Sequence, residues 1–363
     1  MAKASLASLR VTAAAGLALL ALAASLESHV ASSASVRTTD AWGVFTIVSP
    51  SSFFDGLRAK RPAISGSRVA YVTQFFDQTW SFIAVVHDVL TNEVRHIDEL
   101  GNVSGDVLLE GDWFVAERGG DAPGLYLLNL ATGEQRVLPD TGGAYEMPAL
   151  DNGRLVWVRV DGCCSSDLLL YEFATGDITL VTDDGGDSYE YEPDISGDWV
   201  VWFTGTSGYF DVRAKNLLTG ELLWITDEEG NQGIPQIEYP YIVWSDTRIV
   251  DIYGYNLETR ERFPVAVGPE PATYPVIGGR TAFYECGYDW DLLCAHELDG
   301  GAEEVIYTCP AENPYCLNFD LGSESLVTAA EDLVVWLYDK GGAIGLLGAR
   351  RLTQQTFLPL ARR

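Results

Sequence analysis

The order of apolar and polar positions repeats along this chain. Residues 62–71 and 193–202 show the pattern most clearly, because both read Pro-x-Ile-Ser-Gly-x-x-Val-x-aromatic. Equivalent frames begin at residues 62, 107, 148, 193, 235, 275 and 327, with intervals of 40 to 52 residues. A period of about 40–45 residues is typical of the four-stranded blade of a β-propeller.

Agreement between the seven copies is strongest at four positions of the frame. The third, eighth and ninth positions are apolar in every copy, and the tenth is aromatic in six: Tyr71, Trp157, Trp202, Trp244, Tyr284 and Trp336. Consecutive apolar residues place hydrophobic groups on both faces of a strand, so each sheet would pack between two neighbouring sheets.

Each copy continues with a second pair of strands joined by a tight turn. The turns Thr132-Gly133, Thr175-Gly176 and Thr219-Gly220 supply the positive φ that such hairpins demand. We therefore predict an all-β fold, a seven-bladed β-propeller of four-stranded antiparallel blades over residues 62–363, with six or eight blades as the alternative. Residues 35–61 form a lead-in, and residues 41–48 are a candidate outer strand for closing the ring.

The repeat resembles that of a known family. The core Pro-x-Ile-Ser-Gly-x-x-Val-Val-Trp at 193–202, Asp-Ile-Tyr at 251–253 and Leu-x-Thr-Gly at 217–220 are similar to the TolB-type propeller repeat of exported bacterial and archaeal proteins. The resemblance covers about residues 62–360 and implies the propeller part only, without the N-terminal α/β domain of TolB. Such repeats occur in scaffolds and in enzymes, so the resemblance implies fold and not function.

The first residues are typical of a secretory signal peptide. Lys3 and Arg10 precede the apolar run 11–24, and small residues at 21 and 23 suit cleavage. The run is short for a bilayer span, which makes a transmembrane anchor the weaker alternative. We expect residues 1–34 to be the signal peptide and a short linker, and the protein to be exported to the periplasm or the extracellular space.

Six cysteines in an exported chain predict disulfide bonds. Cys286 and Cys294 suit a bridge across a hairpin, and Cys309 with Cys316 could close a loop. For the adjacent Cys163 and Cys164, free thiols and disulfide bonds to more distant cysteines are both open. A metal site is the alternative, but the chain has no Cys-x-x-Cys pair.

The charge of the chain restricts its partners. There are 52 acidic and 23 basic residues, a net charge of −29, so binding to the phosphates of nucleic acids is disfavoured. The connections from the fourth strand of one copy to the first strand of the next are rich in carboxylates and should share one face. We expect this face to bind a cation, a basic ligand or a protein partner, with Ca²⁺ the favoured metal. The candidate ligand-binding residues are Tyr145, Glu146, Asp183, Asp184, Asp187, Glu190, Tyr191, Glu192, Asp227, Glu228, Glu229 and Tyr274. A solvated acidic face that serves only solubility is the alternative.

Signatures of catalysis are lacking in the sequence. It has neither a Gly-x-Ser-x-Gly elbow nor a His-Glu-x-x-His helix. His87, His96 and His296 fall on outer strands of distant copies and do not line up as one site. We therefore expect a monomeric, non-catalytic binding or scaffolding propeller without a membrane anchor; the alternative is a secreted carbohydrate-active lyase or hydrolase that uses the central funnel.

Overall fold

The structure is a computed structural model that divides the chain into two units, residues 1–36 and 37–363. It describes residues 37–351 except 39–41, 52–55, 58–60, 77–79, 101–102, 119–123, 139–143, 161–164, 183–187, 207–208, 311–316, 318–326 and 340–343. The predicted signal peptide, Cys163 and Cys164 lie outside these residues.

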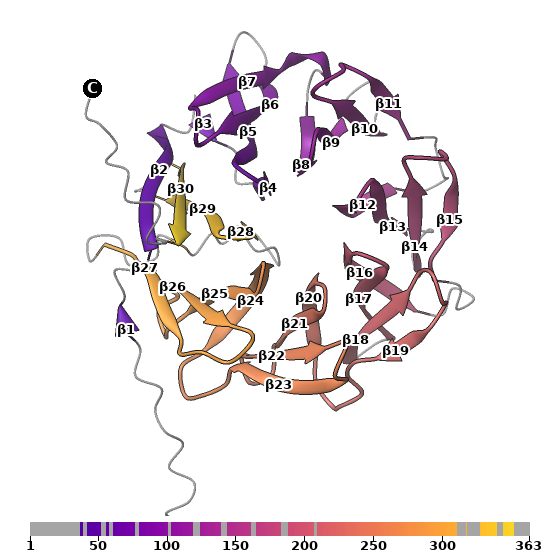
Figure 1. Cartoon of the computed structure of the whole chain (residues 1–363), viewed down its shortest axis with the longest axis vertical. Coiled ribbons are helices and arrows are strands. Elements are labelled where there is room, and N and C mark those ends of the chain that lie inside the picture. The colour runs from indigo at the N-terminus through magenta and orange to yellow at the C-terminus, as the bar shows by residue number, and fades with distance from the viewer. Residues whose placement is uncertain are drawn as a thin grey trace, which may run out of the picture. The chain divides into compact units, whose positions relative to one another are not determined.

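Seven sheets form a ring of blades, which confirms the predicted seven-bladed β-propeller (Figure 1). Within each blade, successive strands pair antiparallel from the centre of the ring outward. The strands are β4 (Ala63–Ser65), β5 (Arg68–Phe76), β6 (Trp80–Asp88) and β7 (Glu93–Ile97) in blade 1; β8 (Val103–Glu110), β9 (Trp113–Arg118), β10 (Gly124–Asn129) and β11 (Gln135–Val137) in blade 2; β12 (Ala144–Asp151), β13 (Arg154–Val160), β14 (Ser166–Glu172) and β15 (Ile178–Leu180) in blade 3; and β16 (Tyr189–Ser196), β17 (Trp199–Thr206), β18 (Tyr209–Asn216) and β19 (Leu222–Trp224) in blade 4. Blade 5 consists of β20 (Gln232–Glu238), β21 (Tyr241–Asp246), β22 (Asp251–Asn256) and β23 (Glu261–Ala266), and blade 6 of β24 (Ala272–Gly278), β25 (Thr281–Cys286), β26 (Leu292–Glu297) and β27 (Glu304–Thr308).

Blade 7 combines strands from both ends of the described chain. Its inner strands are β28 (Val327–Ala330), β29 (Leu333–Asp339) and β30 (Ile344–Arg351), and its outermost strand is β2 (Trp42–Ser51), antiparallel to β30. This pairing closes the ring, because it ties the first strands to the last. Two short strands extend other blades: β1 (Arg37–Thr38) lies parallel to β27, and β3 (Gly56–Leu57) pairs with β5. A 3₁₀ turn covers Asp98–Leu100.

The core consists of layers between neighbouring blades. The aromatic residues at the tenth frame position are its largest members, since Trp157, Trp202, Trp244, Tyr284 and Trp336 are almost completely buried. Burial of a side chain of this size contributes about 3 kcal/mol, so packing between blades explains this aromatic series without a ligand. In the described part of the chain, no helix has the length and apolar character to cross a membrane.

A bulge interrupts most of the inner strands just before the frame begins. The register shifts there in blades 2 to 6. In blades 3 to 6 the residue before the frame proline has a left-handed backbone: Met147, Glu192, Ile234 and Tyr274, with φ between 46° and 57°. A bulge re-aims the side chain that it carries. Two of the predicted ligand-binding residues, Glu192 and Tyr274, are therefore held at re-aimed positions.

Neighbouring blades are also joined at the fourth position of the frame. An oxygen of Ser65, Glu110, Asp151 or Ser196 accepts a hydrogen bond from the amide at the fifth position of the next blade, at 2.6–3.0 Å. These amides belong to the exposed turns that follow the inner strands. The fourth position thus caps the turn of the following blade at four successive interfaces.

Candidate functional site

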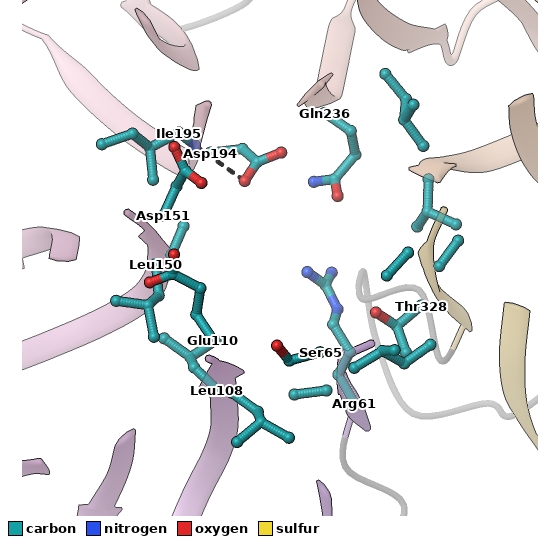
Figure 2. Close-up of a pocket in the computed structure, with 18 of the residues that line it drawn as sticks. Arg61, Ser65, Leu108, Glu110, Leu150, Asp151, Asp194, Ile195, Gln236 and Thr328 are labelled. Carbon is teal, nitrogen blue, oxygen red and sulfur yellow. Dashed lines mark hydrogen bonds between the residues drawn. The ribbon is translucent and has the colours of Figure 1, made fainter. Parts of the chain in front are cut away.

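Two regions of the propeller could hold a ligand, and the first is the central channel. It is a cavity of about 360 Å³ lined by the inner strands of all seven blades. Figure 2 shows Glu110, Asp151 and Asp194 along one side, with Gln236 and the guanidinium of Arg61 pointing inward. Glu238 and Glu331 line the same cavity.

The channel raises the pKa of two of its carboxyl groups. Burial raises the pKa of Asp194 to about 6, although the amides of Ile237 and Ile195 donate to it at 2.8 and 2.9 Å. Burial also raises the pKa of Glu238 to about 7, and the charges of Asp194, Asp151 and Glu331 add to the effect. Carboxyl groups with raised pKa values in a cavity are candidates for a functional site.

Three of the seven carboxylates that line the channel, however, already have backbone partners. Glu110 accepts from the amides of Asn152 and Gly153 at 2.6 and 3.1 Å, and Asp151 accepts from Gly197 at 2.7 Å. Both oxygens of Asp194 are bonded in the same way. These side chains hold successive blades together, so their number does not by itself indicate a ligand.

The second region is the loop face of blade 4, the face that carries the connections from outer to inner strands. Three rings are stacked there: Tyr189 on Tyr191 at 5.9 Å between ring centroids, and Tyr191 on Phe203 at 5.3 Å. Phe210 lies edge-on to both Tyr191 and Phe203. All four rings remain partly exposed. The stack is therefore an aromatic surface and not part of the core.

Carboxylates surround this aromatic stack. Burial raises the pKa of the Tyr191 hydroxyl, and the neighbouring Tyr189, Glu146 and Glu190 raise it further. Glu146 comes from blade 3 and is exposed. Beyond the stack, burial raises the pKa of Tyr274, and Glu285 and Glu192 contribute. Carboxylates from blades 3, 4 and 6 thus lie near the side chains of Tyr191 and Tyr274.

The candidate residues from the sequence divide into four groups. Glu146 with Tyr191, and Glu192 with Tyr274, are brought within electrostatic reach of each other. Asp227, Glu228 and Glu229 are exposed, and Glu228 is paired with Arg262. Glu190 is 1% exposed and turned inward, where Ser188 and Thr204 donate to one of its oxygens at 2.7 and 3.4 Å. Asp183, Asp184, Asp187 and the side chain of Tyr145 lie outside the described residues.

Sequence reasoning missed the carboxylates of the inner strands. Asp194 occupies the second position of the frame, and Glu110, Asp151 and Glu238 occupy the fourth. These positions alternate with the apolar third position, and their pattern in the sequence does not distinguish a side chain that lines a channel from one that faces solvent. The sequence did contain one signal for these residues, because a polar residue recurs at the fourth frame position in several copies.

The disulfide bonds predicted from the sequence are confirmed in part. Cys286 and Cys294 form the predicted disulfide bond across the β25–β26 hairpin. Cys309 is also disulfide-bonded and buried, while Cys316, its predicted partner, lies outside the described residues. Among residues with described positions, no three His, Cys, Asp or Glu side chains are grouped so that they could hold a metal ion.

Comparisons with known proteins find similarity in structure alone. No family model and no curated protein sequence matches the chain. An oligogalacturonate lyase from Vibrio parahaemolyticus is 13% identical with a TM-score of 0.58, over 85% of this chain and 98% of the lyase. An acylaminoacyl peptidase from Pyrococcus horikoshii is 12% identical with a TM-score of 0.58, over 83% of this chain. TolB from Acinetobacter baumannii is 14% identical with a TM-score of 0.45, over 65% of this chain.

These similarities establish the fold and leave the function open. The chain spans 52% of the length of the peptidase and 62% of TolB. The expected TolB-type propeller is confirmed as a fold by its seven antiparallel blades. The similar proteins include enzymes as well as TolB, and a shared propeller hosts unrelated activities.

Proposed function

We propose that this protein is an exported binding propeller whose loop face receives a cationic group of a ligand or partner. The observation that carries the proposal is the stack of Tyr189, Tyr191 and Phe203 beside the exposed carboxylate of Glu146. The faces of aromatic rings attract cations, with about 0.5–1 kcal/mol at exposed sites and about 2 kcal/mol when water is excluded. A neighbouring carboxylate adds direct Coulomb attraction.

The charge of the whole chain favours the same class of ligand. A net charge of −29 concentrates cations near the surface and speeds their association. It also disfavours a polyanionic sugar such as an oligogalacturonate as the ligand. The disulfide bond between Cys286 and Cys294 supports an oxidising compartment and therefore export.

A titration with matched charged and neutral probes tests the proposal. Nα-acetyl-L-argininamide and its neutral analogue Nα-acetyl-L-citrullinamide would be titrated into the protein at low and at physiological salt, and binding would be followed by calorimetry and intrinsic fluorescence. We expect the cationic probe to bind, and salt to weaken its binding. Tyr189→Ala and Glu146→Gln should each weaken it about 5- to 30-fold, which corresponds to about 1–2 kcal/mol.

Tyr288→Ala is the matched control, because Tyr288 is an exposed tyrosine outside the stack. Its substitution should leave the affinity unchanged. Equal binding of the two probes, or an affinity insensitive to Tyr189 and Glu146, would refute the proposal. An arginine-containing peptide that binds much more tightly than Nα-acetyl-L-argininamide would identify the partner as a protein segment.

The alternative is a carbohydrate-active reaction in the channel, and Glu238 is the observation in its favour. Its pKa of about 7 suits a general acid. Glycoside hydrolysis needs a second carboxyl group across the scissile bond, and the nearby Asp194 has both oxygens engaged by amides. Hydrolysis of neutral polysaccharides that disappears in Glu238→Gln would favour this alternative over binding alone.

A further inference from the structure

The loop-side ends of blades 3, 4 and 5 each carry a row of three residues across their first three strands. The rows are Tyr145–Arg159–Asp167 in blade 3, Glu190–Thr204–Asp211 in blade 4 and Gln232–Asp246–Asp251 in blade 5, all in cross-strand register. Residues directly opposite each other in an antiparallel sheet have Cβ atoms about 5 Å apart on the same face. Members of one row are therefore immediate neighbours.

Blade 3 pairs the acid of its row with a cation, and blade 4 supplies hydroxyl groups to the acids of its row. In blade 3, Arg159 forms an ion pair with Asp167, with 2.8 Å between Nη2 and Oδ2. In blade 4, the Thr204 hydroxyl separates the two acids and lies 3.4 Å from an oxygen of Glu190. The Thr226 hydroxyl donates to Asp211 at 3.1 Å.

Blade 5 differs, because two carboxylates lie side by side with neither a cation nor a hydroxyl in the row. Asp246 and Asp251 are 3% and 6% exposed. Asp246 accepts a hydrogen bond from the amide of Arg248 at 3.1 Å, and Asp251 accepts one from the amide of Gly268 at 3.4 Å, so each carboxylate keeps an oxygen without a backbone partner. The nearest described cation is Arg248, whose Nη2 is 3.6 Å from Asp246 while its side chain is 55% exposed. Like charges directly opposite each other destabilise a sheet, and buried charges need a partner or a metal.

The third member of the row provides independent support for a ligand. Gln232 is 1% exposed, and neither atom of its amide has a hydrogen-bond partner. A Cβ placed on Gly230 would lie 3.0 Å from Nε2 of Gln232 and 3.5 Å from Nε of Arg248. The Gln232 amide and the guanidinium that faces Asp246 thus both border Gly230. An unsatisfied buried amide costs about 1–3 kcal/mol, so a group that bonds to it is expected.

We propose that Gln232, Asp246 and Asp251 bind a divalent cation, with Ca²⁺ the preferred ion. Carboxylate and amide oxygens are the hard ligands that Ca²⁺ takes, and the exposed position of Arg248 allows water to complete the shell. The amide can present its oxygen by rotation about its last bond, since the two orientations are not distinguished by shape. Arg248 gives way to solvent when the ion binds. This site shares no residue with the aromatic stack and does not depend on it.

The test is a Ca²⁺ titration of protein stripped with a chelator, followed by calorimetry and thermal unfolding. We expect one equivalent of Ca²⁺ to bind and to raise Tm by about 2–5 °C at millimolar Ca²⁺. A NaCl series of equal ionic strength separates this effect from screening of the overall negative charge. If Tm rises equally in NaCl, or no heat is released on adding Ca²⁺, the buried amide is satisfied by water and the proposal is wrong.

The variant Asp251→Asn distinguishes a role of Asp251 in Ca²⁺ binding from a purely structural role. It removes the repulsion with Asp246, so we expect a higher Tm in chelator than that of the parent protein, together with loss of the response to Ca²⁺. Asp211→Asn is the matched control, because it changes the same position of blade 4; its response to Ca²⁺ should remain. A Ca²⁺ response that survives in Asp251→Asn would place the ion elsewhere and overturn the proposal. Binding of Nα-acetyl-L-argininamide should be unaffected, which distinguishes failure of this site from failure of the aromatic site.

Discussion

Replacement of Glu285 by glutamine should change how the stability of the protein depends on pH. Glu285 is in β25, 9% exposed, and has no hydrogen-bond partner among the described residues. Burial alone raises the pKa of this carboxyl group from 4.5 to about 8. The unfolded chain releases the proton near pH 4.5, whereas the folded protein retains it. Stability therefore falls as the pH rises from about 4.5 to about 8, and below pH 4.5 the group contributes nothing.

The size of the effect follows from the same two pKa values. A difference from 4.5 to about 8 corresponds to about 5 kcal/mol of destabilisation above pH 8. This is an upper bound, because Glu285 is still 9% exposed and water partly screens its charge. We expect Glu285→Gln to match the parent protein at pH 5 and to exceed its free energy of unfolding by about 2–4 kcal/mol at pH 9.

Urea unfolding at pH 5, 7 and 9 measures this difference directly. The raised pKa values of Asp194 and Glu238 also make the protein less stable as the pH rises. Both residues are present in the variant and in the parent protein, so their effect cancels in the comparison. Glu229→Gln is the control, because that carboxylate is exposed; it should leave the pH dependence unchanged. Parallel curves for Glu285→Gln and the parent protein would show that the carboxyl group is solvated, and the reasoning from burial would fail.

Two further predictions concern the joints between blades. Asp151→Ala leaves the Gly197 amide without its acceptor, so it should lower the free energy of unfolding in urea by about 1–3 kcal/mol. The control Asp198→Ala, at the exposed adjoining turn, should lower it by less than about 1 kcal/mol. Equal losses in the two variants would contradict the capping role of Asp151. Trp42→Ala removes the ring that packs on Phe283 at 5.5 Å and donates to Glu304 at 3.0 Å. It should cost about 3–5 kcal/mol, against less than about 1 kcal/mol for the exposed Trp224→Ala. A small effect at Trp42 would mean that β2 does not hold the ring closed.

The fold could be predicted because its determinants are local and repeated. The apolar third, eighth and ninth frame positions and the aromatic tenth position recur in each copy, and packing between blades requires them. The hairpin turns carry their own signal, since Gly133, Gly176 and Gly220 have positive φ values between 74° and 79°. The bulge before the frame was not predicted, because a proline in sequence does not show that the preceding residue is left-handed.

The candidate site was less predictable because the same residue type serves different purposes in different blades. Glu190 and Gln232 occupy equivalent positions, yet the first accepts bonds from two hydroxyl groups and the second has no partner. The difference comes from Ser188 and Thr204, which supply these hydroxyl groups in blade 4. The equivalent residues of blade 5, Gly230 and Asp246, carry no hydroxyl group. A carboxylate or amide is therefore free for a ligand only where its cross-strand neighbours leave it unsatisfied. Composition counts the acids of the loop face, but the register of the sheet decides which of them can bind.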